Sequence, residues 1–238
     1  MLTFECMEKI AIASGKGGVG KTSITFLIAK YLVTKGFKVG LLDADIYGPN
    51  LTELVDVKDS KISMVDTDKG KKFEPINHDG MQINSIGYVL EKDRAAIWRG
   101  PVLSNALKQL YSNTNWTDLD YLLIDMPPGT GDAYLTILND LDVDKAILVA
   151  VEDDFCIADL HRTVTLMNKF KLEILGIVEN LSENFQAGEE MLKSERIISE
   201  FNLNILFALP RLQREEFYNE LKHLNKLKVY FPDNLLIK

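Results

Sequence analysis

A glycine-rich octapeptide at residues 15–22 constrains this chain more than any other feature. Its letters, Gly-Lys-Gly-Gly-Val-Gly-Lys-Thr, fit the phosphate-binding pattern Gly-x4-Gly-Lys-Ser/Thr without a gap. An apolar run at residues 9–13 precedes it and a helical stretch at 23–35 follows, which is the context of a P-loop. Glycines let consecutive N–H groups turn towards phosphate oxygens, and the helix N-terminus adds its positive dipole end. The octapeptide therefore predicts a nucleotide site, against the alternative of a glycine-rich turn without a ligand.

The residues of this loop have separate expected roles in binding MgATP. Lys21 is expected to reach the β- and γ-phosphates, and Thr22 to ligate Mg²⁺ through its hydroxyl. The predicted nucleotide-contacting residues of the loop and first helical turn are Gly15, Lys16, Gly17, Gly18, Val19, Gly20, Lys21, Thr22 and Ser23.

Apolar runs alternate with helical stretches along the rest of the chain. Most of the apolar runs are continuous, which is typical of strands buried on both faces. Strands that alternate with helices favour right-handed crossovers, with ligands at the carboxyl ends of the strands. The sequence predicts an α/β fold with a single doubly wound, mostly parallel sheet, a P-loop NTPase. Strands are expected at residues 9–13, 38–43, 81–86, 121–125, 146–151, 175–178 and 205–208, and helices at 23–35, 102–111, 158–170, 189–201 and 213–227.

The length and the patterning predict the domain organisation. The chain has 238 residues, which is enough for one sizeable core. We expect a single P-loop ATPase domain over residues 1–238. Residues 56–76 are polar and weakly patterned, which indicates a surface excursion with a hairpin that ends at 73–76. Residues 228–238 form an apolar tail that docks on the body of the protein or on another subunit.

Composition and charge limit the possible partners and the compartment. The net charge of −8 argues against a nucleic-acid partner, because phosphate backbones attract clustered Lys and Arg. Two cysteines are too few for a disulfide scaffold, and no apolar run approaches the roughly 20 residues that span a bilayer. We expect a cytoplasmic protein that binds no nucleic acid and no membrane.

Carboxylates end two of the predicted strands. Asp43 and Asp45 follow the second apolar run, and Asp125 ends the run at 121–125. A hydrophobic strand that ends in Asp is the Walker B arrangement, in which the carboxylate holds Mg²⁺ opposite the P-loop threonine. The alternative is that each Asp only caps the next helix. The nearby P-loop favours a metal set of Thr22, Asp43 and Asp125.

Asp45 and Asp132 lie just beyond their strands in turn-rich segments. Loops of this kind sense the γ-phosphate, and a carboxylate on one is placed to orient the attacking water. For Asp132 the alternative is an N-cap of the helix that starts near residue 133.

Several long segments together carry a family resemblance. The octapeptide resembles the deviant Walker A motif of the ParA/MinD ATPases, in which Lys16 is the signature lysine. More narrowly, four segments resemble the Mrp/ApbC branch of iron–sulfur cluster carriers and assembly ATPases. They are residues 43–50 (DADIYGPN), 97–101 (IWRGP), 119–132 (LDYLLIDMPPGTGD) and 176–182 (GIVENLS). The resemblance runs from about residue 8 to 182 and more weakly to 211.

The resemblance implies an assembly and roles for particular residues. It implies a homodimer that sandwiches two ATP molecules, with Lys16 reaching the nucleotide of the other subunit as an arginine finger does. It implies that Asp45 is the water-activating carboxylate and that Asp43 helps the Mg²⁺ shell. It also implies that Asn180 bonds the adenine edge and that Pro210 lines the base. The predicted catalytic residues are Lys16, Lys21 and Asp45.

One departure from the branch concerns cluster carriage. Members of the branch bear a Cys-x-x-Cys motif shortly after the segment that matches residues 179–182, whereas residues 183–190 of this chain contain no cysteine. Iron–sulfur clusters are usually held by four cysteines. A dimer has four only if Cys6 and Cys156 of both chains converge, and we interpret both as buried or edge thiols. The sequence predicts little stable cluster.

An apolar stripe marks the predicted C-terminal helix. MinD-like proteins grip membranes with such a helix, but acidic and basic residues balance here, and the basic bias that an anionic membrane surface attracts is missing. Packing on the sheet or on a partner is the favoured interpretation. The stripe consists of Phe217, Leu221, Leu224 and Leu227.

Two functions are compatible with these observations. The favoured one is a dimeric, slowly hydrolysing MgATPase of Mrp type in iron–sulfur cluster assembly or transfer, with an iron–sulfur or metallocofactor client protein. The alternative is a MinD/ParA-like positioning or scaffold ATPase that switches a partner protein or a membrane contact.

Overall fold

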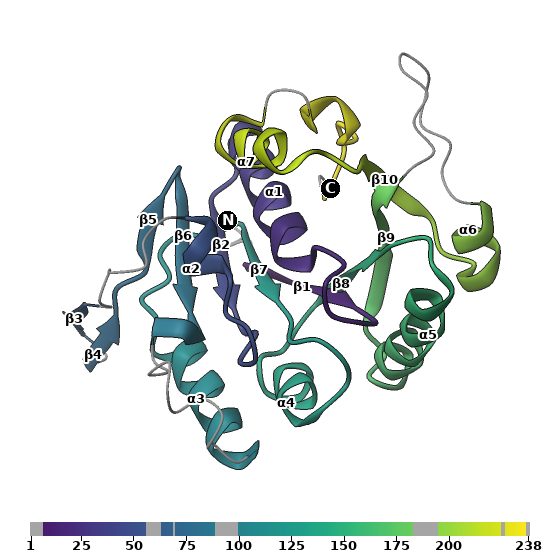
Figure 1. Ribbon diagram of the computed structural model, residues 1–238. Helices are drawn as coiled ribbons and strands as arrows, with labels where there is room; N and C mark the ends of the chain where they lie inside the picture. Colours follow the sequence, from purple (N-terminus) through teal and green to yellow (C-terminus); the bar gives the residue numbers. More distant parts are fainter. Residues whose placement is uncertain are drawn as a thin grey trace, which may run out of the picture.

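A mostly parallel sheet with helices on both faces forms the body of the protein (Figure 1). The computed structural model describes residues 7–55, 63–68, 70–88, 100–182, 195–224 and 227–236. The eight strands of the sheet follow the order β10-β9-β8-β1-β7-β2-β6-β5. All neighbours pair in parallel except β5, which runs antiparallel to β6. The predicted α/β class and doubly wound sheet are confirmed.

The strands coincide with the predicted apolar runs, most of them with small changes at the ends. The seven strands that match predicted runs, β1, β2, β6, β7, β8, β9 and β10, are mostly buried at their centres, as continuous apolar runs predict, whereas β3, β4 and β5 are partly exposed and match no predicted strand. Within the described part of residues 56–76, β3 and β4 pair as a small antiparallel hairpin whose second strand ends at Phe73, as expected. The strands are β1 (Glu8–Ser14), β2 (Val39–Asp43), β3 (Met64–Thr67), β4 (Gly70–Phe73), β5 (Ile76–His78), β6 (Met81–Ser85), β7 (Tyr121–Asp125), β8 (Lys145–Ala150), β9 (Glu173–Ser182) and β10 (Ile205–Pro210).

The helices divide between the two faces of the sheet. On one face lie α1 (Lys21–Thr34), α7 (Arg214–His223) and the 3-10 turn η3 (Leu227–Tyr230). On the other face lie α3 (Gly100–Ser112), α4 (Asp132–Asp140) and α5 (Asp154–Lys169) (Figure 1). Short helical pieces are α2 (Leu51–Leu54), α6 (Glu195–Phe201) and the 3-10 turn η1 (Ile86–Tyr88).

The C-terminal helix and tail pack on α1 and cover it. Leu221, Leu224 and Leu227 of the predicted stripe are buried, so this stripe faces the body of the protein. The helix ends at His223 because Leu224 turns the chain with a left-handed φ of 46°. Further on, Phe231 stacks on Tyr31 of α1 with ring centroids 4.7 Å apart. The described part of the tail therefore packs on its own chain.

Some predictions concern residues outside the described ranges. They include residues 97–99 of the IWRGP segment, the 183–190 segment, Cys6 and the first part of the 189–201 helix. Within the ranges described, no helix is both long enough and apolar enough to cross a bilayer.

Candidate nucleotide site

The loop between β1 and α1 has the conformation that a phosphate-binding turn requires. Gly18 and Gly20 have φ angles of 83° and 87°, in the left-handed region that glycine adopts without strain. Gly20 is also the N-cap residue of α1, and a Cβ on it would lie 2.4 Å from Asn180 Nδ2. A side chain at position 20 would both strain the backbone and displace Asn180.

The start of the loop packs against α5. A Cβ on Gly15 would lie 2.4 Å from the backbone nitrogen of Leu160, and backbone cannot move aside as a flexible side chain can. Ser14 donates a hydrogen bond from its hydroxyl to the Lys16 carbonyl at 3.0 Å, which fixes the first turn. These contacts hold the loop at the carboxyl end of β1.

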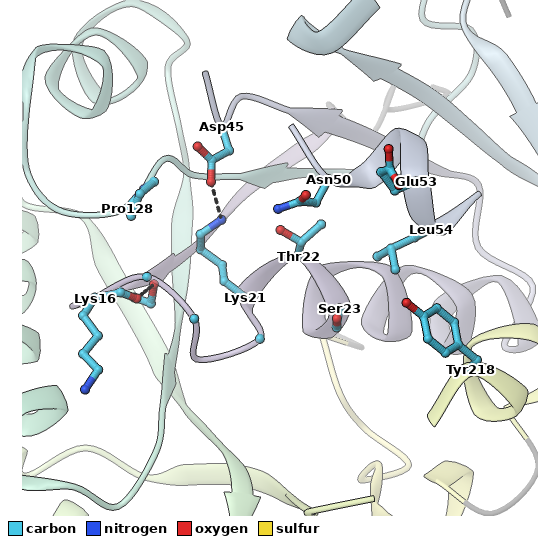
Figure 2. A pocket seen from close by; sticks show the side chains of 14 residues that line it. Lys16, Lys21, Thr22, Ser23, Asp45, Asn50, Glu53, Leu54, Pro128 and Tyr218 are labelled. Atoms are coloured by element: carbon cyan, nitrogen blue, oxygen red, sulfur yellow. Dashed lines mark hydrogen bonds and ion pairs between the residues drawn. The ribbon is translucent and has the colours of Figure 1, made fainter. Parts of the chain in front are cut away.

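A cleft of about 410 Å³ opens along this loop (Figure 2). Its size is that of a typical small-molecule site. α1 starts at Lys21, so the positive end of its dipole faces the cleft. Most of the predicted loop residues line it, whereas Gly15 and Val19 do not. The lining residues are Ser14, Lys16, Gly17, Gly18, Gly20, Lys21, Thr22, Ser23, Asp45, Asn50, Glu53, Leu54, Pro128 and Tyr218.

Lys21 joins the loop to two of the predicted carboxylates. Its Nζ lies 2.5 Å from Asp125 Oδ1 and 3.9 Å from Asp45 Oδ2, and all three side chains are almost fully buried. Figure 2 shows the Lys21–Asp45 pair. Asp125 ends β7, where its Cα pairs with that of Asp43 in β2 and that of Ile12 in β1. The parallel register of the central strands therefore brings residues about 80 to 100 positions apart together. Phosphate oxygens in the cleft would compete with these carboxylates for the Lys21 ammonium.

One carboxylate oxygen of Asp125 is available to a further ligand. Its Oδ2 is buried and makes no hydrogen bond to any described residue. The first-turn residue Thr22 lines the cleft, whereas Asp125 is not among the lining residues. In the described parts of the chain, no group of three or more His, Cys, Asp or Glu side chains is placed to hold a metal. The unbonded Asp125 Oδ2 and the Thr22 hydroxyl fit a Mg²⁺ whose other ligands would be phosphate oxygens and waters, as P-loop sites hold it.

Asp43 faces the protein and not the cleft. It is fully buried, and its Oδ1 accepts the N–H of Asp45 at 3.1 Å. Its Oδ2 accepts the Leu51 N–H at 3.3 Å and the Ser85 hydroxyl at 2.9 Å. Burial and the neighbouring Asp125 carboxylate raise the pKa of Asp43 to about 7. Asp43 anchors the loop that follows β2, and its place in the Mg²⁺ shell stays a prediction.

Asp45 points into the cleft from the loop anchored by Asp43. Its Oδ1 accepts the N–H groups of Tyr47 and Gly48 at 3.1 and 3.2 Å, which fixes the side chain. Its other oxygen, Oδ2, is the one nearest Lys21. Burial raises the pKa of Asp45, while Lys21 opposes that rise. A largely buried carboxylate beside Lys21 is suited to orient a water molecule.

Lys16 points away from the cleft that it helps to line (Figure 2). Its Nζ is 3.1 Å from Asp153 Oδ2 and 5.9 Å from the centre of the Phe155 ring. Asp153 caps α5 and accepts the Cys156 N–H at 3.0 Å; this bond and Lys16 hold the pKa of Asp153 below its usual range. The Lys16 side chain is thus part-exposed and directed away from the cleft of its own chain.

A second cleft of about 580 Å³ borders the same loop. It shares Lys16, Gly17 and Gly18 with the first cleft and extends towards the ends of β8 and β9. Both signs of charge line it. Its other residues are Val19, Val151, Glu152, Asp153, Leu181, Ser182, Arg196 and Arg211.

Asn180 and Pro210 are placed near the loop but outside both clefts. Asn180 donates from Nδ2 to the Val19 carbonyl at 2.8 Å, so it braces the P-loop. Pro210 ends β10 opposite Ser182 of β9, and its neighbour Arg211 lines the second cleft. Their predicted contacts with the base stay predictions.

Two other residues singled out in the sequence have structural surroundings. Asp132 is the first residue of α4, and the N-cap position is Gly131, so the capping alternative for Asp132 is wrong. Cys156 is fully buried in the first turn of α5, as a small buried thiol. Burial raises the pKa of this thiol.

Several lining residues escaped the sequence analysis. Glu53 and Leu54 come from α2, and Tyr218 comes from α7, which is almost 200 positions from the loop. No spacing rule links such segments. Asp153 was detectable, because an Asp just before a helical stretch is a cap signal.

Residues 5–211 match the ParA family, described as NUBPL iron-transfer P-loop NTPases. The iron-sulfur cluster carrier protein of Haemophilus influenzae is 38% identical over 208 residues, covering 84% of this chain and 55% of that protein. The iron-sulfur cluster carrier protein of Salmonella typhimurium is 44% identical over 173 residues, covering 73% of this chain and 46% of that protein. The chain thus spans about half the length of these curated relatives.

Solved structures share the fold. A nucleotide-binding protein from Archaeoglobus fulgidus, in complex with ADP, is 31% identical with a TM-score of 0.71, covering 95% of this chain and 89% of that chain. The septum site-determining protein MinD of Pyrococcus horikoshii, complexed with Mg-ADP, is 22% identical with a TM-score of 0.64, covering 91% of this chain and 86% of that chain.

Proposed function

This chain belongs to the NUBPL iron-transfer family of P-loop NTPases, and we propose that it is a dimeric, slowly hydrolysing MgATPase of Mrp type that acts in iron–sulfur cluster assembly or transfer. One observation carries the proposal. Most of the glycine loop, Lys21 and Thr22 line one cleft, and the buried Asp125 pairs with Lys21 and has one oxygen without a hydrogen bond to the described residues. The ADP complex of the Archaeoglobus fulgidus protein supports the assignment of that cleft to a nucleotide.

The loop amides and Lys21 bind the polyphosphate in this proposal. Phosphate oxygens replace Asp125 and Asp45 as partners of Lys21, which leaves the Asp125 carboxylate available to Mg²⁺. Thr22 and Asp125 would hold Mg²⁺, which neutralises charge that develops on the phosphates during transfer. Asp45 orients the attacking water from its fixed position on the 44–50 loop.

Lys16 acts across a two-fold dimer in this proposal. Its side chain is directed away from its own cleft, so a partner chain supplies the second cation to each nucleotide. Closing two chains over the nucleotides also excludes water from the reacting phosphates.

The iron–sulfur cluster is the cargo of this activity. The relatives are named as cluster carriers, whereas this sequence has only two cysteines, Cys6 and Cys156, and no Cys-x-x-Cys motif. Since Cys156 is fully buried, we propose that a client protein holds the cluster and that the ATP-dependent dimer acts on that client.

Two measurements on the purified protein test this function. The first is phosphate release from ATP, measured with Mg²⁺ and with excess chelator. Slow, Mg²⁺-dependent release is expected, and a protein that neither binds ATP nor releases phosphate would rule out an ATPase.

The second is anaerobic reconstitution with iron and sulfide, followed by absorbance and metal analysis. Little stable cluster is expected. A stoichiometric cluster that disappears in Cys6→Ser or Cys156→Ser would contradict the assignment of the cluster to a client.

A further inference from the structure

The loop at residues 44–50 is held by an adjacent segment that has no assigned role. This segment is Ser85–Gly87, the end of β6 and the start of η1. The Ser85 hydroxyl donates to Asp43 Oδ2 at 2.9 Å and accepts the Gly87 N–H at 3.0 Å. Asp43 in turn accepts the N–H groups of Asp45 and Leu51 at the two ends of the loop. Ser85 thus acts on both ends of the loop through one carboxylate.

Gly87 makes a second contact with the same loop. A Cβ on Gly87 would lie 2.9 Å from Pro49 Cβ and 3.2 Å from Ser85 Oγ. The absence of a side chain therefore lets Pro49 pack on the backbone of η1. The loop is held at Asp43 by hydrogen bonds and at Pro49 by packing.

The hydrogen bonds continue from Ser85 into the body of the protein. The Ser85 N–H donates to Asn84 Oδ1 at 2.8 Å, and Asn84 Nδ2 donates to Thr114 Oγ1 at 2.7 Å. The Thr114 hydroxyl donates to the Leu110 carbonyl of α3 at 2.5 Å. Asn84, Ser85 and Thr114 are all at least 98% buried. Buried polar groups cost stability unless each is bonded, and a fully bonded network specifies one arrangement.

We propose that Ser85 and Gly87 are positioning residues for ATP hydrolysis, which hold the 44–50 loop so that Asp45 faces the phosphate end of the cleft. This inference rests on the proposed function, because its effect on the rate depends on Asp45 orienting the attacking water. Neither residue lines the cleft, so both act through the loop. Small displacements of a reacting group have large effects on rate, while the P-loop amides that bind phosphate stay in place.

Two variants test this positioning role. Ser85→Ala removes the hydroxyl between Asp43 and η1, and Gly87→Ala pushes Pro49 without a change of polarity. For each we expect kcat to fall between about tenfold and about a hundredfold, with KM for ATP and the affinity for MgADP within about twofold of the wild type. Ser104→Ala is the matched control. It removes a half-buried hydroxyl that pairs with the Thr136 hydroxyl of α4 at 2.6 Å and is no part of the hydrogen bonds between Asp43, Ser85 and Gly87.

Hydrogen–deuterium exchange of the nucleotide-free protein gives a readout that does not depend on hydrolysis. Peptides covering residues 44–51 are expected to exchange faster in both variants and at the wild-type rate in Ser104→Ala. Wild-type exchange over residues 44–51 in both variants would overturn the proposal, as would an equal loss of kcat and MgADP affinity in both. A wild-type protein without ATPase activity would instead refute the proposed function and leave the exchange result to decide on the loop.

Discussion

At the scale of single residues, the ammonium of Lys21 is the most informative group. It lies between the buried Asp125 and Asp45, so it balances two carboxylates that burial would otherwise penalise. A polyphosphate offers it charge-assisted bonds of the same kind. Binding therefore exchanges one set of anionic partners for another, which lets the cleft accept a highly charged ligand.

We expect Lys21→Ala to lose ATP binding or turnover. Removing a hydrogen bond to a charged group costs about 1.5–3 kcal/mol, so the affinity for MgATP should fall at least about tenfold. Calorimetric titration measures this, with Lys108→Ala as a control because Lys108 pairs with Asp140 at the surface. Wild-type turnover in Lys21→Ala would show that the reaction takes place elsewhere.

Lys16 should separate binding from hydrolysis. Its side chain points away from its own cleft, so Lys16→Ala should leave MgATP affinity almost unchanged and lower kcat at least about tenfold. Steady-state phosphate release together with a binding titration checks both parts. Equal turnover in the variant and the wild type would remove the role of this lysine across the dimer.

At the scale of elements, Lys30 connects three segments that are distant in sequence. This side chain of α1 donates to the Leu221 carbonyl at 3.0 Å, to the Lys222 carbonyl and to Asp79 Oδ2 at 2.7 Å. The two carbonyls belong to the last turn of α7, where a cation offsets the negative end of the helix dipole. One lysine thus caps α7 and joins it to the turn between β5 and β6.

The Lys30–Asp79 pair predicts a pH dependence of stability. The hydrogen bond from Lys30 lowers the pKa of Asp79. A carboxyl group whose pKa is lower in the folded than in the unfolded protein stabilises the fold. This stabilisation is fully present above the unfolded-state pKa of about 3.9 and is lost as the pH falls through the folded-state pKa. The free energy of unfolding of the wild type should therefore exceed that of Asp79→Asn by a constant amount above about pH 5, and the difference should shrink below about pH 4. Asparagine tolerates the φ of 47° at this position. A difference that does not change with pH would contradict the pair's contribution.

The tail stabilises the fold by covering α1. Phe231 is 6% exposed and packs between Tyr31 and Phe207. Phe231→Ala should lower the free energy of unfolding by about 3 kcal/mol. Val229→Ala should change it by less than about 0.5 kcal/mol, because Val229 is 77% exposed. Urea denaturation measures both, and equal effects would mean that the tail does not pack as described.

Sequence patterns predicted elements better than they predicted contacts. The run at 121–125 gave β7 with both ends correct, because an apolar run ending in Asp has sharp limits. The predicted 158–170 helix starts earlier, at Asp154, because Asp153 caps it. The metal-site prediction did not foresee that Asp43 bonds to Ser85 or that Lys21 pairs with Asp125. Those contacts depend on strand order, which no local spacing encodes.

At the scale of the whole molecule, the central strands bring the chemistry to one edge of the sheet. The ends of β1, β2 and β7 carry the loop, Asp45 and Asp125, while α1 and α5 fix the loop from opposite faces. Lys16 lines the second cleft at the same edge, where it pairs with Asp153. In the proposed dimer, a second copy of the chain would meet the reacting groups at this edge.

The central claim is that residues 15–22 wrap a nucleotide polyphosphate and that two chains close over it. A crystal structure of Asp45→Ala with MgATP tests it most directly, because slowed hydrolysis preserves the bound nucleotide. We predict phosphates against the loop amides, Lys21 Nζ moved from Asp125 to a phosphate oxygen, and Lys16 of each chain at the other chain's nucleotide. A loop without nucleotide, or one filled by a side chain of the protein itself, would contradict the account.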